Sequence, residues 1–424
     1  MKFITYFFPL SRKRLKTREA FLKSLKSFTN LCGIIAAMFS ESLIRLKEKN
    51  LLREIKNCNS PQGSRILMDG KNYINFSSND YLGLANYPHV IESAQKAIET
   101  FGFGSGASRL LCGGSILHHE LEKKTAEFKG TESALIFNSG YSANTGIIPA
   151  IADEGDVIFS DELNHASIVD GCRLSKAKKI IYRHNDMGHL SELIEKEKAK
   201  RKIIITDSVF SMNGDIAPLK EIYNCCRTLN SKLSTPEFLL YIDDAHGTGV
   251  LGKGKGALAH FGIKPEPWII QMGTFSKALG SFGAFAAGSK NAIEWILNTA
   301  RSFIFSTALP SCAAAASIAA LEVIEKEPEL VNKLWANREL AVHGITKLGY
   351  DIMGSETPII PIRIGTVEEA LHISRHLIGN GIFAPAIRPP SVKEPRIRIT
   401  VISAHTAEDI EGLIIALGSI TVKQ

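Results

Sequence analysis

The segment TFSKALGSFG, residues 274–283, has a lysine just after an apolar run and glycines just after the lysine. Only a neutral amine attacks an aldehyde, and burial lowers the pKa of a lysine toward the neutral form. Glycines allow a backbone to approach a bulky ring closely. Lys277 therefore fits a lysine that forms an imine with an aldehyde cofactor, although a lysine at a strand end is more often a solvated surface residue.

The segment YIDDAHGTG, residues 241–249, ends another apolar run with two aspartates. A buried carboxylate needs a cationic partner. A protonated pyridine nitrogen paired with Asp243 would provide one and would make the ring an electron sink. His246 follows and can hydrogen-bond a phenolic oxygen on the same ring. These groups indicate pyridoxal 5′-phosphate (PLP), whereas the competing interpretation is a turn capped by an aspartate.

Three further segments contain groups that suit PLP and an amino-acid substrate. In SDELNHASIVDG, His165 either caps a helix or presents a flat ring for stacking. In NSGYSAN, Gly140 and Tyr141 lie at an expected helix N-terminus, where backbone N–H groups bind phosphate. In AIRPP, Arg388 can hold a substrate carboxylate through two hydrogen bonds. Each segment alone is weak evidence, and their order and spacing together are specific.

Short β-branched runs alternate with helical patterns through the body of the chain. The runs are residues 134–137, 156–160, 178–182, 202–208, 238–244, 268–274 and 282–288. Apolar strands separated by helices predict an α/β fold with a large, doubly wound, mostly parallel sheet. Ligands bind such sheets beyond the carboxyl ends of the strands. Polar residues follow these ends at Ser139, Asp161, Ser211, Asp243 and Thr274.

The domain organisation is predicted from composition and pattern. Residues 1–37 form a basic N-terminal extension that is disordered or precedes the true start at Met38. Residues 38–78 form an arm, residues 79–310 the large PLP-binding domain, and residues 311–424 a smaller C-terminal α/β domain. A chain of 424 residues exceeds the usual size of a single core, which agrees with this division.

Composition excludes several classes of protein. The net charge is +7, but residues 1–50 contain 11 Lys/Arg and three Asp/Glu, so the rest of the chain offers no basic field for nucleic acid. The seven cysteines lack metal-ligand spacing and indicate reduced thiols in the cytoplasm, with no metal. The apolar run at residues 31–39 is too short for a membrane span.

These motifs resemble those of the α-oxoamine synthases, PLP enzymes of fold type I (aspartate-aminotransferase-like) that join an amino acid to an acyl thioester with loss of carbon dioxide. The resemblance covers residues 45–420, and the matching segments are FSSNDYLGL, FGFGSGASRLLCG, SDELNHASI, VFSMNGDIAPL, DDAHGTGVLG, TFSKALG and AIRPP. Around DDAHGTGV and AIRPP the chain is most similar to members that condense L-alanine with a pimeloyl thioester. The 2-amino-3-ketobutyrate ligases and 5-aminolevulinate synthases are the second choice.

The resemblance implies a role for each matching residue. Lys277 holds the cofactor and moves protons, His165 stacks on the ring, and Asp243 pairs with the ring nitrogen. The residues implied to reach the phenolic oxygen are His246 and Ser211. Those implied to bind phosphate are Gly140, Tyr141 and Thr274, with Ser306 and Thr307 reaching the phosphate of a neighbouring subunit in a homodimer. Those implied to lie near the substrates are Arg53, Asn79, His165, Arg388 and Ser391, the last replacing the usual threonine.

Two other classes are compared with this one. A non-catalytic descendant of the fold would lack Lys277 or Asp243, and both are present. A nicotinamide-dependent dehydrogenase needs a glycine-rich loop after a strand, but GFGSG at residues 102–106 follows a helical pattern. We therefore expect a soluble acyltransferase that takes its acyl group from CoA or from an acyl carrier protein.

Overall fold

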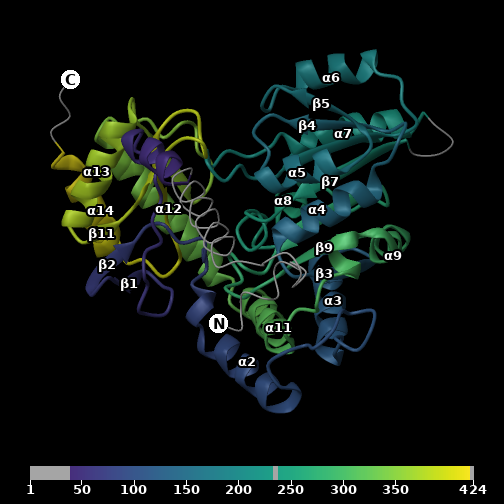
Figure 1. The fold of residues 1–424 in the computed structure, drawn as a ribbon, viewed down its shortest axis with the longest axis horizontal. Coiled ribbons are helices and arrows are strands. Elements are labelled where there is room, and N and C mark those ends of the chain that lie inside the picture. The colour runs from purple at the N-terminus through teal and green to yellow at the C-terminus, as the bar shows by residue number, and fades with distance from the viewer. Residues whose placement is uncertain (1–38, 233–236, 421–424) are drawn as a thin grey trace, which may run out of the picture. The chain divides into compact units, whose positions relative to one another are not determined.

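The computed structural model describes residues 39–232 and 237–420. The chain divides into two compact units, Met1–Lys56 and Asn57–Gln424, which we describe separately. In the first unit, residues 39–48 are helical. The predicted basic extension, residues 1–37, lies outside the described residues. All labelled elements in Figure 1 belong to the second unit.

A seven-stranded sheet with the order β3-β9-β8-β7-β6-β4-β5 lies in the second unit. Its strands are β3 (Ser133–Phe137), β4 (Val157–Asp161), β5 (Lys178–Tyr182), β6 (Lys202–Asp207), β7 (Phe238–Asp243), β8 (Ile269–Thr274) and β9 (Ala284–Gly288). Five neighbouring strands, from β8 to β5, run parallel, whereas β9 is antiparallel to both of its neighbours. The predicted α/β fold with a mostly parallel sheet is confirmed.

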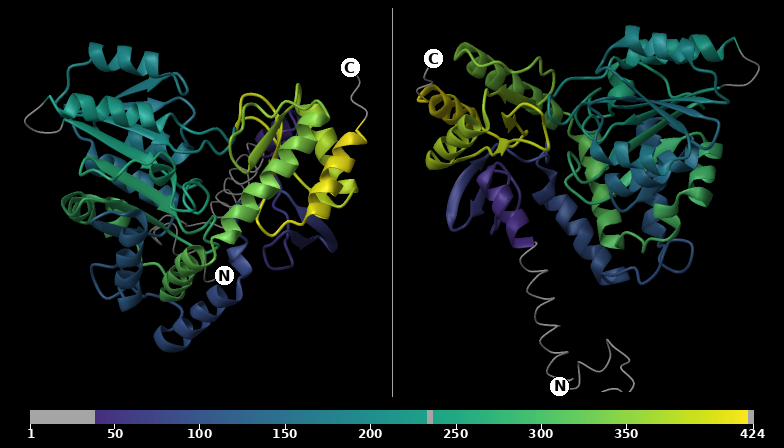
Figure 2. Two further views of the ribbon diagram at one scale, coloured as in Figure 1. Left: turned by 180° about the vertical axis from the view of Figure 1, so that it is seen from behind. Right: turned by 45° about the horizontal axis from the view of Figure 1, so that its top comes forward.

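Helices cover both faces of this sheet (Figures 1 and 2). On one face are α4 (Gly140–Ile151), α5 (Ala166–Leu174), α9 (Lys290–Thr299) and α10 (Arg301–Ile304). On the other are α3 (Ile116–Lys129), α6 (Met187–Lys196), α7 (Leu219–Asn230) and α11 (Ser311–Lys326). Because side chains alternate along a strand, Ile203 and Ile205 pack into one core and Ile204 into the other. This double burial explains the unbroken apolar runs.

A third core lies around two smaller sheets. One contains β10 (Ile359–Arg363), β13 (Arg396–Thr400) and β12 (Ala386–Ile387), and the other β1 (Arg65–Met68), β2 (Lys71–Asn75) and β11 (Ile382–Phe383). The helices packed on them are α12 (Glu329–Lys347), α13 (Val367–Gly379) and α14 (Ala407–Gly418). β2 pairs with β11, so part of the predicted arm joins C-terminal strands. The predicted domain boundaries at 79 and 311 stay a prediction.

The remaining elements include α2 (Pro88–Phe101), the 3-10 helix η1 (Leu84–Asn86) and α8 (Ala257–His260). None of the helices in the described part of the chain is long and apolar enough to cross a membrane. Within residues 39–232 and 237–420, no group of His, Cys, Asp and Glu side chains is arranged to hold a metal ion.

Candidate active site

Lys277 lies in a tight loop that follows β8. The loop is closed by backbone hydrogen bonds from Gly280 N to Lys277 O, 2.9 Å, and from Phe275 N to Gly283 O, 3.0 Å. The lysine is partly exposed. Removal from water lowers its pKa, whereas the nearby carboxylates of Asp243 and Asp207 act in the opposite direction. The structure thus favours a larger neutral fraction of this amine than water would.

Asp243 and Asp244 end β7 in different surroundings. Asp244 accepts a 2.7 Å salt bridge from Lys129 Nζ, with both side chains 1% exposed. Asp243 is also buried, but among the described residues no cation lies within salt-bridge distance of it. Its carboxylate instead accepts hydrogen bonds from Asn144 Nδ2, 2.8 Å, and from the Ala245 N–H, 3.0 Å. Burial raises the pKa of Asp243, which indicates a site that suits a cation.

A second buried carboxylate, Asp207, ends the neighbouring strand β6 directly opposite Asp243. Its Oδ2 accepts the backbone N–H of His165 at 2.7 Å. Burial raises the pKa of Asp207 well above its ordinary value, and the charge of Asp243 adds to the rise. Asp207 has no role predicted from the sequence, although this residue lies at the end of a predicted strand.

His246 follows Asp243 and is buried against Tyr81. Its Nδ1 lies 2.7 Å from the Tyr81 hydroxyl. Burial lowers the pKa of His246 well below its usual value, and the cations Lys277 and Arg398 lower it further. Burial raises the pKa of Tyr81 to about 12, and Arg398 acts against this rise. His246 is therefore a neutral imidazole in the same charged cluster as Lys277.

His165 is the N-cap residue of α5, and the residue as a whole is exposed. Its Nδ1 accepts a hydrogen bond from Ser167 N and lies 2.7 Å from Ser167 Oγ. Partial burial lowers the pKa of His165, while Asp243 raises it. The side chain of His165 caps the helix through Nδ1 and the residue is exposed, so capping does not exclude stacking on a cofactor.

The N-terminus of α4 lies beside the end of β8. A Cβ atom added to Gly140 would lie 2.8 Å from Thr274 Cγ2, so only glycine allows this approach. Ser139 caps the helix by accepting the Ser142 N–H. Tyr141 is exposed, and its hydroxyl donates to Asp170. The N–H groups of a first helical turn that lack a helical partner are of the kind that suits an anion.

Ser211 lies in the segment after β6 and contacts Arg398 of the smaller sheet. Arg398, on β13, donates from Nε to Ser211 O at 2.6 Å and from Nη2 to Asn79 Oδ1 at 3.1 Å. Arg398 is buried, and its role was not predicted from the sequence. Arg388 is partly exposed after β12, and Ser391 is exposed beyond it, its N–H bonded to Arg388 O.

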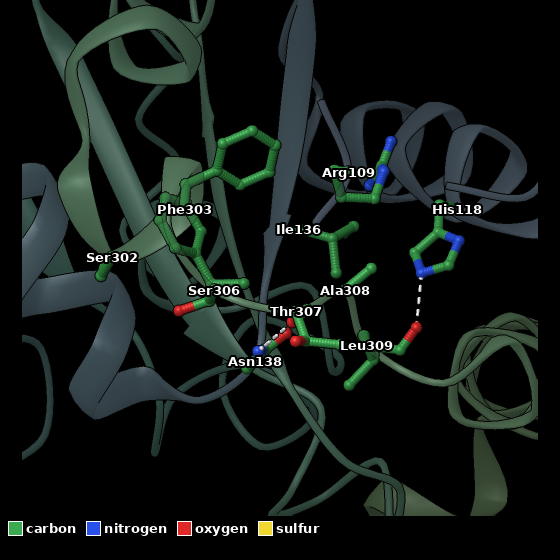
Figure 3. A pocket seen from close by; sticks show the side chains of 11 residues that line it. Arg109, His118, Ile136, Asn138, Ser302, Phe303, Ser306, Thr307, Ala308 and Leu309 are labelled. Carbon is green, nitrogen blue, oxygen red and sulfur yellow. Dashed lines mark hydrogen bonds between the residues drawn. The ribbon is translucent and has the colours of Figure 1, made fainter. Parts of the chain in front are cut away.

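Ser306 and Thr307 lie elsewhere, in a small cavity after α10 (Figure 3). Asn138 Nδ2 donates to Thr307 O at 2.7 Å, and His118 Nε2 lies 2.7 Å from Leu309 O. The cavity-lining residues do not include Lys277. Arg53 belongs to the first unit. The expected contacts of Ser306 and Thr307 involve a partner subunit, and the expected contact of Arg53 involves the first unit, so all three stay predictions.

The residues of the cluster fit PLP. Asp243 is a buried carboxylate without a cationic partner in the described chain, whereas its neighbour Asp244 has one. Lys277 has a lowered pKa, and Gly140 opens a helix N-terminus whose N–H groups suit a phosphate. A ring nitrogen that carries a proton, an aldehyde and a phosphate match these three groups.

Residues 71–417 match the model of the family described as aminotransferase class I and II. The chain belongs to this aminotransferase family. Within the family it is similar to a putative 8-amino-7-oxononanoate synthase of Thermodesulfovibrio yellowstonii, with 54% identity over 89% of this chain and 95% of that protein. It is also similar to the 8-amino-7-oxononanoate synthase of Geobacter metallireducens, with 46% identity over 90% and 97% of the two chains.

Solved structures of this family share the fold. Serine palmitoyltransferase of S. paucimobilis with bound PLP superposes with a TM-score of 0.83 at 26% identity, covering 92% of this chain and 97% of that chain. The 8-amino-7-oxononanoate synthase of Francisella tularensis gives a TM-score of 0.70 at 27% identity, covering 82% and 97%. The predicted fold type and membership of the α-oxoamine synthases are confirmed.

Proposed function

We propose that this chain catalyses the reaction of the 8-amino-7-oxononanoate synthases with PLP as cofactor. L-Alanine and a pimeloyl thioester give 8-amino-7-oxononanoate, carbon dioxide and the free thiol, a step of biotin biosynthesis. The observation that carries the proposal is that Lys277, whose pKa is lowered, lies near Asp243, a buried carboxylate with no salt-bridge partner among the described residues. Relatives of the same activity at 43–54% identity support it.

PLP supplies an aldehyde that bonds to amines and a ring that takes up negative charge from the adjoining carbon. Lys277 Nζ would hold the cofactor, and the same amine, when free, would remove and return the proton on the α-carbon of the amino acid. Asp243 keeps a proton on the pyridine nitrogen. His165 would cover one face of the ring, and His246 with Ser211 would bind the phenolic oxygen. Gly140, Tyr141 and Thr274 bind the phosphate.

The assay that tests this function pairs several amino acids with several acyl thioesters. We expect pimeloyl-CoA with L-alanine to give a product of the mass of 8-amino-7-oxononanoate and one carbon dioxide per turnover. Pimeloyl-carrier protein is the second donor, and it decides between free CoA and a carrier protein as partner. A higher kcat/KM for glycine than for alanine would instead assign the 2-amino-3-ketobutyrate ligase or 5-aminolevulinate synthase reaction.

Substrate positioning is assigned to Arg388, with Asn79, Ser391 and Arg53 nearby. Arg388 is partly exposed at the end of β12, and its guanidinium suits the carboxylate that all amino acids share. Arg388→Ala should therefore lower kcat/KM for alanine and glycine by similar factors, on the order of tenfold or more. The exposed Lys393→Ala variant is the control. A loss confined to alanine would contradict a contact with the carboxylate.

We also propose a homodimer in the cytoplasm, in which Ser306 and Thr307 complete the phosphate site of the partner subunit. The segment that contains Ser306 and Thr307 contacts the segment around Ala107, since Ala308 N donates a hydrogen bond to Ala107 O. These segments expose large apolar side chains, namely Phe103, Leu110, Leu111 and Phe305. Exposed apolar surface of this kind favours association.

Mixed dimers test the shared site. Lys277→Ala protomers should be unable to form the imine with PLP. Thr307→Val protomers should bind the phosphate of PLP more weakly in the partner's site. Refolding the two together should restore activity, because one of the two sites in a mixed dimer has both native residues. A mixture with no more activity than its components would contradict a shared site, and a monomer by light scattering would contradict the dimer.

A further inference from the structure

Asn144, on α4, lies between two residues of the proposed cofactor site. Its Nδ2 group is 2.8 Å from Asp243 Oδ2 and 2.8 Å from Ser167 Oγ. Ser167 Oγ is in turn 2.7 Å from Nδ1 of His165. Hydrogen bonds therefore connect the carboxylate assigned to the ring nitrogen with the imidazole assigned to the ring face.

Each hydrogen bond in the series from Tyr241 through Asn144 and Ser167 to His165 has only one reasonable direction. Tyr241 donates its hydroxyl proton to Asn144 Oδ1 at 2.6 Å. The two N–H bonds of Asn144 Nδ2 then donate to Asp243 and to Ser167. The opposite orientation of the amide would place its oxygen against the Asp243 carboxylate, which is repulsive. Because Ser167 Oγ accepts from Asn144, its own proton is directed to His165 Nδ1.

His165 Nδ1 receives a second donor, the backbone N–H of Ser167, at 3.2 Å. A nitrogen that accepts hydrogen bonds cannot carry a proton, so the proton of the neutral ring is on Nε2. The chain of bonds thus fixes both the tautomer of His165 and the orientation of the Asp243 carboxylate.

Tight packing holds the chain of bonds in place. Asn144, Ser167 and Tyr241 are at most 1% exposed. On the facing helix α5, a Cβ atom added to Gly171 would lie 2.6 Å from the Asn144 carbonyl oxygen. The two helices therefore cannot shift easily relative to each other, and the low exposure keeps competing water away.

We propose that Asn144 is a positioning residue that couples Asp243 to His165, orienting the carboxylate and holding His165 as its Nε2-protonated tautomer. Its role toward the cofactor rests on the proposed function, whereas the tautomer of His165 does not. The two parts can therefore fail separately.

Nitrogen-15 NMR of the imidazole rings in the cofactor-free protein tests the tautomer, with His165→Gln used to assign the signal. We expect a neutral ring with an unprotonated, hydrogen-bonded Nδ1 at mildly alkaline pH. Asn144→Leu should shift the Nδ1 signal toward the protonated form, because the Ser167 hydroxyl is then free to accept a hydrogen bond from Nδ1 and only the weaker backbone donor at 3.2 Å still favours an unprotonated Nδ1. A wild-type ring protonated on Nδ1 would overturn the proposal without any variant.

Binding of PLP to the same variants tests the coupling. Loss of a hydrogen bond to a charged group predicts a dissociation constant for PLP that rises about tenfold or more in Asn144→Leu. Ser167→Ala removes only the hydrogen bonds that link Asn144 to His165, and it should raise the dissociation constant for PLP less. Asn337→Leu is the matched control, because Asn337 is a buried asparagine on α12 that bonds to the carbonyl oxygens of Ile402 and His405.

Equal PLP affinity in Asn144→Leu and Asn337→Leu, with an unchanged His165 signal, would contradict the proposal. If no variant or wild-type protein binds PLP, the proposed function fails, and the NMR result still decides the tautomer. If Asn144→Leu does not fold, Tyr241→Phe removes the first donor of the chain and should shift the His165 signal in the same direction.

Discussion

Asp243 and Asp244 are consecutive and both buried, yet only Asp244 is paired with a lysine, Lys129, at 2.7 Å. Two adjacent residues of the same type therefore serve different purposes. The Lys129–Asp244 pair stabilises the loop after β7, since Asp244 also accepts the Thr248 hydroxyl and Ala257 N–H. Asp243 has no salt-bridge partner among the described residues and remains available to a cation such as a protonated ring nitrogen.

Substitution of the two aspartates should separate stability from cofactor binding. Asp244→Asn leaves Lys129 buried without its counter-charge and should lower the free energy of unfolding by about 3–5 kcal/mol. Asp243→Asn should leave the stability of the cofactor-free protein unchanged or raise it, because it removes a buried charge beside Asp207, and it should abolish most turnover. Denaturant unfolding and steady-state kinetics measure both effects. Equal loss of stability in both variants would contradict the distinction.

The loop of Lys277 should depend on Gly280. This glycine has φ +60°, and a Cβ atom there would lie 2.1 Å from the backbone nitrogen of Ala85. Gly262 has a similar φ of +63°, with no atom within 4 Å. Gly262→Ala should therefore cost only the backbone strain, about 1–2 kcal/mol. Gly280→Ala should cost more and also reduce PLP content, measured by unfolding and by visible absorbance; equal effects would show that the contact with Ala85 is unimportant.

His184 makes the stability of the protein depend on pH. Its Nδ1 lies 2.9 Å from Asp161 and its Nε2 2.6 Å from Asp215. Burial alone would lower the pKa of His184, but these carboxylates outweigh it and raise the pKa from 6.5 to about 9. The charged ring is thus stabilised in the folded state, by about 3 kcal/mol below pH 6.5.

This contribution should decline as the pH rises from 6.5 through about 9. Free energies of unfolding over this range, compared between the native protein and His184→Gln, isolate it from other groups. The difference between the two proteins should be largest at the acidic end and should shrink at the alkaline end. A difference that does not vary with pH would show that His184 is neutral throughout.

Much of the site was predictable because its residues are local to strand ends. Lys277, Asp243, His165 and Gly140 follow β8, β7, β4 and β3, and parallel strands bring their carboxyl ends to one edge. A hairpin between β1 and β2 was missed although Asp69-Gly70, with φ of 49° and 78°, is a strong turn signal.

The remaining contacts could not be predicted, since they join residues distant in sequence. Asn144 reaches Asp243 across 99 positions, and Arg398 reaches Ser211 across 187. Asparagine at a helix start and arginine on a strand each have many possible partners, and only packing selects one. The positions of Ser306, Thr307 and Arg53 relative to a shared site depend on a partner subunit or on the first unit.

Reduction of the PLP-loaded protein with borohydride, followed by peptide mapping, tests the central claim most directly. The purified protein should absorb visible light, and the reduced cofactor should be recovered on the peptide that contains Lys277, which carries the amine of lowered pKa. Lys277→Ala should lose both this linkage and turnover while keeping its fold. Recovery of the reduced cofactor on a peptide without Lys277 would contradict the account.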